Sequence, residues 1–183
     1  MSTEIQYDAA IKSCRDIFLT KTRDYGTSWR VYRTISVVDQ IYIKAKRIRT
    51  IQEKGEQRVG DDIHSEFMGI VNYSIIGLIQ LQLAQGETEE LPLPQVAAQY
   101  DEKACNARKL MLDKNHDYGE AWREMSQESF TDLVLSKLMR IRQILANGGQ
   151  SASSEGIDAN YYDIINYAVF ALILMQETSG KVF

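Results

Sequence analysis

Apolar residues recur at helical spacing in three stretches of each half of the chain. The first stretches cover roughly 4–20 and 97–113, the second roughly 34–54 and 129–147, and the third roughly 62–84 and 157–178. Period-two alternation, which is typical of strands, is scarce. The pattern therefore predicts an all-α protein.

The third stretch of each half begins polar and ends almost wholly apolar, as in Ile75–Ile79 and Val169–Met175. A helix that is apolar on all sides is usually buried. We therefore expect the two third helices at the centre of the molecule. The longest apolar run, 168–175, is far shorter than the roughly 18 residues typical of a membrane span, so no membrane partner is expected.

The chain contains an internal repeat. Lys21-x-x-Asp24-Tyr25-Gly26-x-x-Trp29-Arg30 overlays Lys114-x-x-Asp117-Tyr118-Gly119-x-x-Trp122-Arg123 at a shift of 93 positions. The shift continues through the second stretch, and after a one-residue slip it pairs Asn72-Tyr73 with Asn166-Tyr167. Such periodicity defines the structural unit. We predict two tandem three-helix repeats, 1–88 and 97–183, joined by a linker at 89–96 and packed as one body about a pseudo-twofold axis.

The composition and charge of the chain limit which kinds of partner and location we expect. The net charge is −4 and no basic stripe dominates either half, which argues against direct nucleic-acid binding; a phosphorylated partner would need a local positive site. Cys14 and Cys105 are not equivalent under the repeat, so a duplicated disulfide or metal knuckle is not expected. The N-terminal residues 1–8 lack the profile of a signal peptide. These features favour a reducing, cytoplasmic location.

The repeated Asp-Tyr-Gly motif suits a helix stop, because aspartate stabilises turns and glycine accepts positive φ. That explanation leaves the duplicated cations unexplained. Cations beside tyrosine and tryptophan rings can bind a phosphorylated base, with the rings stacking on the base and the cations meeting phosphate. The candidate substrate-binding residues of this motif are Lys21, Asp24, Tyr25, Trp29, Arg30, Lys114, Asp117, Tyr118, Trp122 and Arg123.

The second helix of each repeat carries a lysine and an arginine one turn apart, with an aspartate upstream. Lys44 and Arg47 correspond to Lys137 and Arg140, and Asp39 corresponds to Asp132. An exposed face with ion pairs explains the pattern, and so does a shared binding role in both repeats.

Each third helix keeps one acid of a Glu-x-x-Asp pair. Glu66 aligns with Asn160, and Asp163 aligns with Gly69. Two carboxylates three residues apart on a helix can share a divalent cation, which for a phosphate substrate would be Mg²⁺. The duplicated Asn72 and Asn166 are costly in an apolar helix unless they are hydrogen-bonded, so a cross-helix hydrogen bond competes with ligand contact.

These motifs together resemble the family called nucleotide modification associated domain 1, in two tandem copies that cover nearly the whole chain. The helix arrangement is in turn similar to the all-α nucleoside triphosphate pyrophosphatases of the MazG and dimeric dUTPase type, in which acids on successive helices hold magnesium that activates water. The resemblance implies a MazG-like bundle with Mg²⁺ as cofactor. It assigns catalysis and metal binding to Glu66 and Asp163, weaker metal binding to Asp39 and Asp132, and phosphate contacts to Lys44, Arg47, Lys137 and Arg140.

Departures from the pyrophosphatase pattern leave alternatives open. Ile43 and Ser136 stand near where the second helix would carry an acid, and Gly69 and Asn160 break the third-helix pair. A composite site that takes Glu66 from one repeat and Asp163 from the other would restore the pair of acids. We expect a nucleotide-binding protein, with magnesium-dependent pyrophosphohydrolysis of modified or ordinary nucleoside triphosphates as its enzymatic form. The alternative is a non-catalytic interaction or scaffold module with degenerate sites, and a homodimer is compatible with either.

Overall fold

The computed structural model describes residues 1–83, 90–150 and 155–180. Within these residues the chain forms six α-helices and two short 3-10 helices, and no strand. The elements are α1 (Thr3–Tyr25), η1 (Ser28–Val31), α2 (Thr34–Lys54), α3 (Ile63–Gln82), α4 (Leu93–Tyr118), η2 (Ala121–Glu124), α5 (Gln127–Ala146) and α6 (Ile157–Ser179). The prediction of an all-α protein built from two three-helix repeats is confirmed.

The first helix of each repeat runs further than the apolar pattern predicts. α1 and α4 continue to Tyr25 and Tyr118, and each ends at a glycine with φ of 64°. The Asp-Tyr-Gly motif is therefore the last helical turn together with its stop. α4 also begins earlier than position 97, at Leu93. Pro94 does not prevent this, because it lies in the first turn, where backbone N–H groups have no partner within the helix. The loop expected after α5 lies partly outside the described residues.

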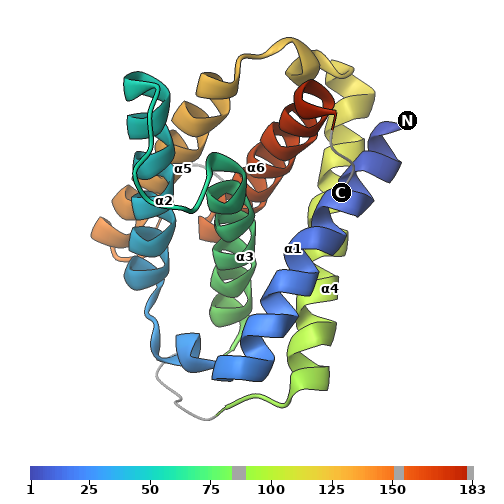
Figure 1. The fold of residues 1–183 in the computed structure, drawn as a ribbon. Coiled ribbons are helices and arrows are strands. Elements are labelled where there is room, and N and C mark those ends of the chain that lie inside the picture. The colour runs from blue at the N-terminus through green and yellow to red at the C-terminus, as the bar shows by residue number, and fades with distance from the viewer. Residues whose placement is uncertain (84–89, 151–154, 181–183) are drawn as a thin grey trace.

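The helices pack in three layers, each made of one pair of equivalent helices. Figure 1 shows α3 and α6 between the α2 and α5 pair on one side and the α1 and α4 pair on the other, and these pairs are in contact. Each helix of one repeat thus lies beside its counterpart in the other repeat. This arrangement is the predicted pseudo-twofold bundle.

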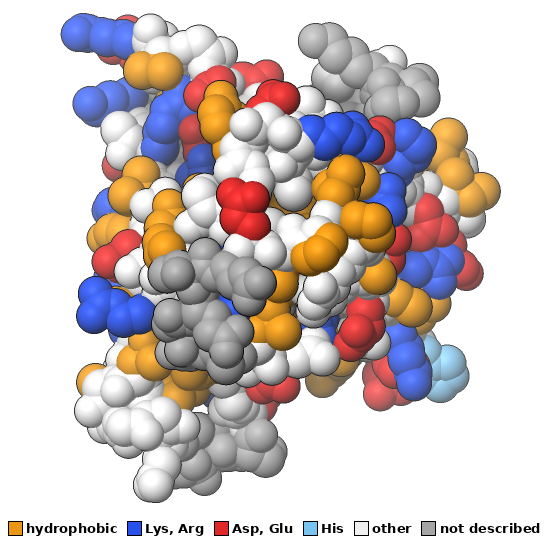
Figure 2. All heavy atoms as spheres, turned by 90° about the horizontal axis from the view of Figure 1, so that it is seen from below, with side chains coloured by type: hydrophobic (Ala, Val, Ile, Leu, Met, Phe, Trp, Pro, Cys, Tyr) orange, Lys and Arg blue, Asp and Glu red, His pale blue; other side chains and the backbone are white. Residues whose placement is uncertain are grey.

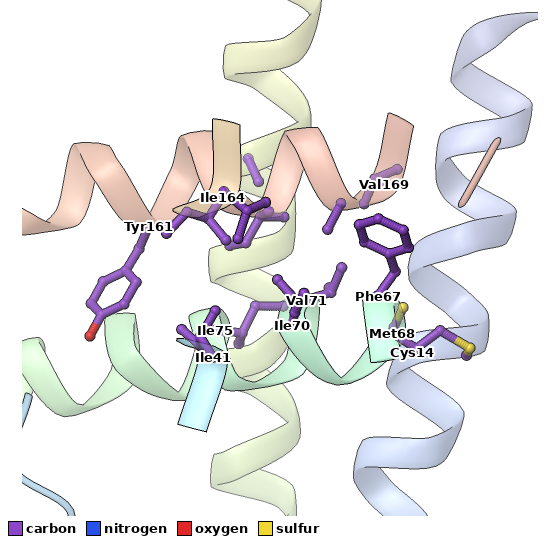
Figure 3. Close-up of a cluster of buried hydrophobic side chains, with 14 of the residues drawn as sticks. Cys14, Ile41, Phe67, Met68, Ile70, Val71, Ile75, Tyr161, Ile164 and Val169 are labelled. Atoms are coloured by element: carbon purple, nitrogen blue, oxygen red, sulfur yellow. The ribbon is translucent and has the colours of Figure 1, made fainter. Parts of the chain in front are cut away.

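The two third helices form the centre of the core, as expected. Ile70 and Val71 of α3 and Ile164 and Val169 of α6 are fully buried, and Figure 3 shows these side chains gathered between the two helices. The Tyr161 ring of α6 packs directly against Gly77 of α3. Any larger residue at position 77 would clash, because a Cβ there would lie 2.5 Å from that ring. Apolar residues on most sides of both helices are explained by this central position.

Reciprocal buried hydrogen bonds join the repeats. The Tyr7 hydroxyl donates to Asn166 Oδ1 at 2.7 Å, and the equivalent Tyr100 hydroxyl donates to Asn72 Oδ1 at 2.8 Å. Each asparagine also donates its amide to a backbone carbonyl in the first helix of its own repeat, at 3.0 and 3.1 Å. The two duplicated asparagines are thus structural groups whose side-chain oxygen and nitrogen both have protein partners.

Surface ion pairs repeat the same symmetry. Arg15 pairs with Asp101 at 2.6 Å, and Arg108 pairs with Asp8 at 2.7 Å. All four residues are related by the shift of the sequence repeat. Much of the similarity between the two halves therefore reflects contacts between the repeats.

None of the described helices has an apolar stretch long enough to cross a bilayer. Figure 2 views one end of the bundle, where the basic and acidic side chains that the structure describes are interspersed and do not gather into a patch of one sign.

Replacing Tyr7 with phenylalanine tests the reciprocal hydrogen bonds. Tyr7→Phe removes the donor that Asn166 Oδ1 uses in a fully buried site, and an unmet buried acceptor costs about 1–3 kcal/mol. We expect the free energy of unfolding, measured by urea titration, to fall by that amount.

The matched control is Asp16→Asn in the exposed Lys12–Asp16 ion pair. Exposed pairs of this kind contribute at most about 1 kcal/mol, so the control should stay close to the wild type. Equal stability of the Tyr7→Phe variant and the wild type would contradict the role given to the tyrosine.

Candidate functional site

Each repeat contains a pocket between its first helix, its Tyr-Gly turn and its third helix. The repeat-one pocket has a volume of about 420 Å³, and its lining includes Lys21, Tyr25, Trp29, Lys44, Glu66, Gly69, Asn72, Tyr73 and Ile76. The repeat-two pocket has about 140 Å³, and its lining includes Lys114, Tyr118, Trp122, Asp163, Asn166, Tyr167 and Phe170. Most of these residues are equivalent under the repeat. Each pocket is lined by residues of its own repeat alone.

Arg30 holds the tryptophan side of the repeat-one pocket in place. Its guanidinium donates to the side-chain oxygen of Gln80, and the Gln80 amide donates to the carbonyls of Trp29 at 3.1 Å and of Tyr32 at 2.9 Å. Arg30 is only 2% exposed and does not line the pocket. This residue, expected to meet phosphate, instead fastens η1 to α3.

Three other residues of the turn motif, Arg123, Asp24 and Asp117, also lie outside the pockets. Arg123 pairs with Glu120 at 2.7 Å and with Glu177 at 2.9 Å, and its guanidinium lies over the Trp122 ring. Asp24 and Asp117 are exposed and do not line either pocket. Of the ten motif residues expected to bind substrate, six therefore line a pocket: Lys21, Tyr25, Trp29, Lys114, Tyr118 and Trp122.

In repeat one the second-helix cations converge on Glu66. Arg47 Nη1 lies 2.8 Å from Glu66 Oε1, and Lys44 Nζ lies 3.5 Å from Oε2 and 5.8 Å from the centre of the Tyr73 ring. Glu66 itself is 7% exposed. Lys21 is exposed at the pocket and makes no ion pair with the residues that the structure describes.

In repeat two the carboxylate is one turn further along the third helix. Asp163 accepts from Lys114 Nζ at 2.7 Å and lies 2.9 Å from Lys137 Nζ, while Arg140 pairs with Glu155 at 2.9 Å. Burial alone would lower the pKa of Lys114, but the hydrogen bond and charge of Asp163 outweigh burial and raise that pKa. Asp163 therefore balances two lysines, Lys114 at the pocket and Lys137 of α5.

The four carboxylates expected to hold magnesium lie in separate ion pairs. Glu66 and Asp163 share neither a pocket nor a cationic partner. The two weaker candidates join α2 to α5, where Asp39 pairs with Arg142 at 2.8 Å and Asp132 lies 3.7 Å from Arg49.

Within the described ranges, histidine, cysteine, aspartate and glutamate side chains form no group of three or more that could hold a metal ion. Glu66 and Asp163 each already face two cations, whose positive charge repels a further cation. In the part of the chain that the structure describes, these carboxylates do not fit a magnesium ion held by protein ligands alone, and Glu66 and Asp163 do not form a composite metal centre.

The sequence motifs omitted several pocket residues. Tyr73 was visible as a duplicated neighbour of Asn72, but Tyr32 aligns with Met125 and gave no repeat signal. The difference between Ile76 and Phe170 also carried no signal, because both are apolar residues of a buried helix. Only the geometry shows that this position faces the pocket in both repeats.

The pairing of Lys114 predicts a pH dependence. Because the folded-state pKa is raised, the pair stabilises the protein below the ordinary lysine pKa, and this contribution is lost as pH rises through the raised value. In Asp163→Asn we expect the pKa of Lys114 to fall, since burial then acts without a compensating charge. Titration of ¹³C-labelled lysine by NMR measures it, and an unchanged value would contradict the pairing. Asp16→Asn, at a remote exposed pair, should leave the Lys114 signal unaffected.

Comparison with known proteins agrees with the division into two repeats. No curated protein and no solved structure matches the chain. A family model described as nucleotide modification associated domain 1 matches residues 21–81 and 114–175, which together make up more than half of the chain. Each matched segment begins at a pocket lysine and extends through most of the third helix. The chain therefore belongs to the nucleotide modification associated domain 1 family.

Proposed function

We propose that the protein binds a nucleotide, or a similar phosphorylated ring compound, in the repeat-one pocket. The observation that carries the proposal is Lys21, a pocket cation with no acidic partner in the described part of the chain. The volume of about 420 Å³ falls within the range of small-molecule sites. The description of the family is consistent with a nucleotide as the ligand.

The pocket offers distinct contacts for the two parts of such a ligand. Lys21 supplies a charge for phosphate, and the rings of Trp29, Tyr25 and Tyr73 offer faces for a base. Tyr25 is 73% exposed, so ordering it against a base would bury apolar surface. Lys44 contributes a second positive charge, while Glu66 limits how far that lysine can move.

Binding is better supported than hydrolysis. Magnesium often reaches a site with phosphate and needs only one or two protein carboxylates. Glu66 and Asp61 line the same pocket, but both oxygens of Glu66 already face cations. We therefore propose binding as the function, and the binding experiment below also tests for pyrophosphohydrolysis of nucleoside triphosphates.

The scaffold alternative rests on the reciprocal contacts. Tyr7, Tyr100 and the two asparagines are duplicated because they join the repeats, which needs no ligand. That explanation does not extend to Lys21 or Tyr25, which are exposed at the pocket. We also propose a cytoplasmic location, supported by the two free cysteines. Homodimer formation stays a prediction.

Replacing each pocket lysine in turn tests the proposed site. The pure protein is titrated with each ribo- and deoxynucleoside triphosphate, with and without Mg²⁺, by isothermal calorimetry. Lys21→Ala should weaken binding by about tenfold or more, because a charge-assisted hydrogen bond contributes roughly 1.5–3 kcal/mol. The matched control Lys114→Ala changes the equivalent residue and should bind like the wild type.

Mass spectrometry of the same mixtures detects turnover. Monophosphate and pyrophosphate formed by the wild type would add hydrolysis to the proposed function. Absence of binding for every nucleotide would refute the proposal and favour the scaffold alternative. Equal losses in both lysine variants would show that the site is not confined to repeat one.

A further inference from the structure

We propose that the repeat-two pocket is occupied by the protein's own side chains. Asp163 stands in place of a ligand's anionic group, and Phe170 stands in place of its ring. The chain then binds one ligand, in the repeat-one pocket. This inference rests on the proposed function, since it takes the repeat-one pocket as the open copy.

Asp163 occupies the place of an anionic group between two lysines. Lys114 and Lys137 lie 2.7 and 2.9 Å from the two oxygens of Asp163. Their equivalents are Lys21 and Lys44, and the equivalent of Asp163 is Gly69. Repeat one therefore keeps both cations of this pair but has no carboxylate at the position where Asp163 neutralises them.

Gly69 leaves room that its counterpart fills. A Cβ at Gly69 would lie 2.9 Å from Lys44 Cε, so the lysine side chain passes directly over the glycine. Lys44 turns instead toward Glu66, one turn earlier on α3, at the longer distance of 3.5 Å. The equivalent of Glu66 is Asn160, whose amide bonds a backbone carbonyl. The acid therefore stands at different positions on the third helix in the two repeats. Only in repeat two does it contact both lysines.

Phe170 occupies the place of a ligand ring on the repeat-two tryptophan. In repeat two the Phe170 ring stacks on Trp122, with centroids 4.2 Å apart and planes 6° from parallel. The equivalent of Phe170 is Ile76. Trp29 has Phe18 as a ring neighbour, but at 6.5 Å and tilted by 41°. A parallel ring partner is therefore already present on the repeat-two tryptophan and is not found on Trp29 among the described residues.

The volumes of the two pockets agree with self-occupancy of the second. The repeat-two pocket retains about 140 Å³, against about 420 Å³ in repeat one.

The occupants indicate the chemistry of the ligand. Aromatic rings prefer offset parallel stacking, and lysines pair with oxyanions, so a compound with a flat ring and an anionic group makes both contacts at once. A phosphorylated nucleoside meets this description. The positions of Gly69 and Ile76 then determine which repeat accepts it.

The experiment exchanges these two positions between the repeats. Asp163→Gly with Phe170→Ile gives repeat two the residues of repeat one, and Gly69→Asp with Ile76→Phe does the reverse. Stoichiometry is measured by calorimetry and native mass spectrometry with each ribo- and deoxynucleoside triphosphate. We expect one equivalent for the wild type, two for the first variant, and at least a tenfold loss of affinity for the second.

A second measurement identifies which pocket is filled. Acetylation of individual lysines, followed by mass spectrometry, should show that nucleotide protects Lys21 in the wild type and both Lys21 and Lys114 in the first variant. One equivalent bound by the first variant, or two by the wild type, would overturn the inference. If that variant does not fold, as judged by circular dichroism, Asp163→Asn replaces it, with the same protection of Lys114 expected and its absence contradicting the inference.

The two proposals fail differently. If no triphosphate binds the wild type, the proposed function fails, and self-occupancy is tested with inorganic pyrophosphate instead. Protection of Lys114 by pyrophosphate in the first variant but not in the wild type would uphold it. Equal protection of Lys114 in both proteins, or none in either, would refute it.

Discussion

The hydrogen bonds between Tyr7 and Asn166 and between Tyr100 and Asn72 are the constraint on which the rest of the structure depends. Their four side chains are buried or nearly so, and a polar group in that environment is tolerated only with a partner in the right place. Each bond connects the first helix of one repeat to the third helix of the other. Each asparagine also bonds the first helix of its own repeat, so the four side chains together hold in place the helices that line both pockets.

The site is built from residues that the interface does not use. Asn72 and Asn166 line the pockets, yet their hydrogen-bonding groups are taken by protein partners. The arginine of the turn motif is likewise committed in both copies, to Gln80 in repeat one and to glutamates in repeat two. What is left for a ligand in repeat one is a cation and several ring faces.

The helices were predictable because their periodicity is a local property. The turn motif was also assigned correctly as a helix stop, since a glycine at positive φ depends on its immediate neighbours. The partners of charged residues were not predictable. Asp39 has the spacing of a site residue, but it pairs with Arg142, more than a hundred positions away, and only the packing of α2 on α5 brings the two together.

The reciprocal bonds have a consequence for how the two pockets can differ. An interface in which the same residues act on both sides is isologous, as in a homodimer of identical subunits. In such a dimer a single codon change alters both sites at once. Here a peptide linkage joins the two halves, so each position is encoded twice and can vary alone. Asp163 and Gly69 could not coexist in a symmetric dimer, and covalent fusion is what permits one pocket to close while its twin stays open.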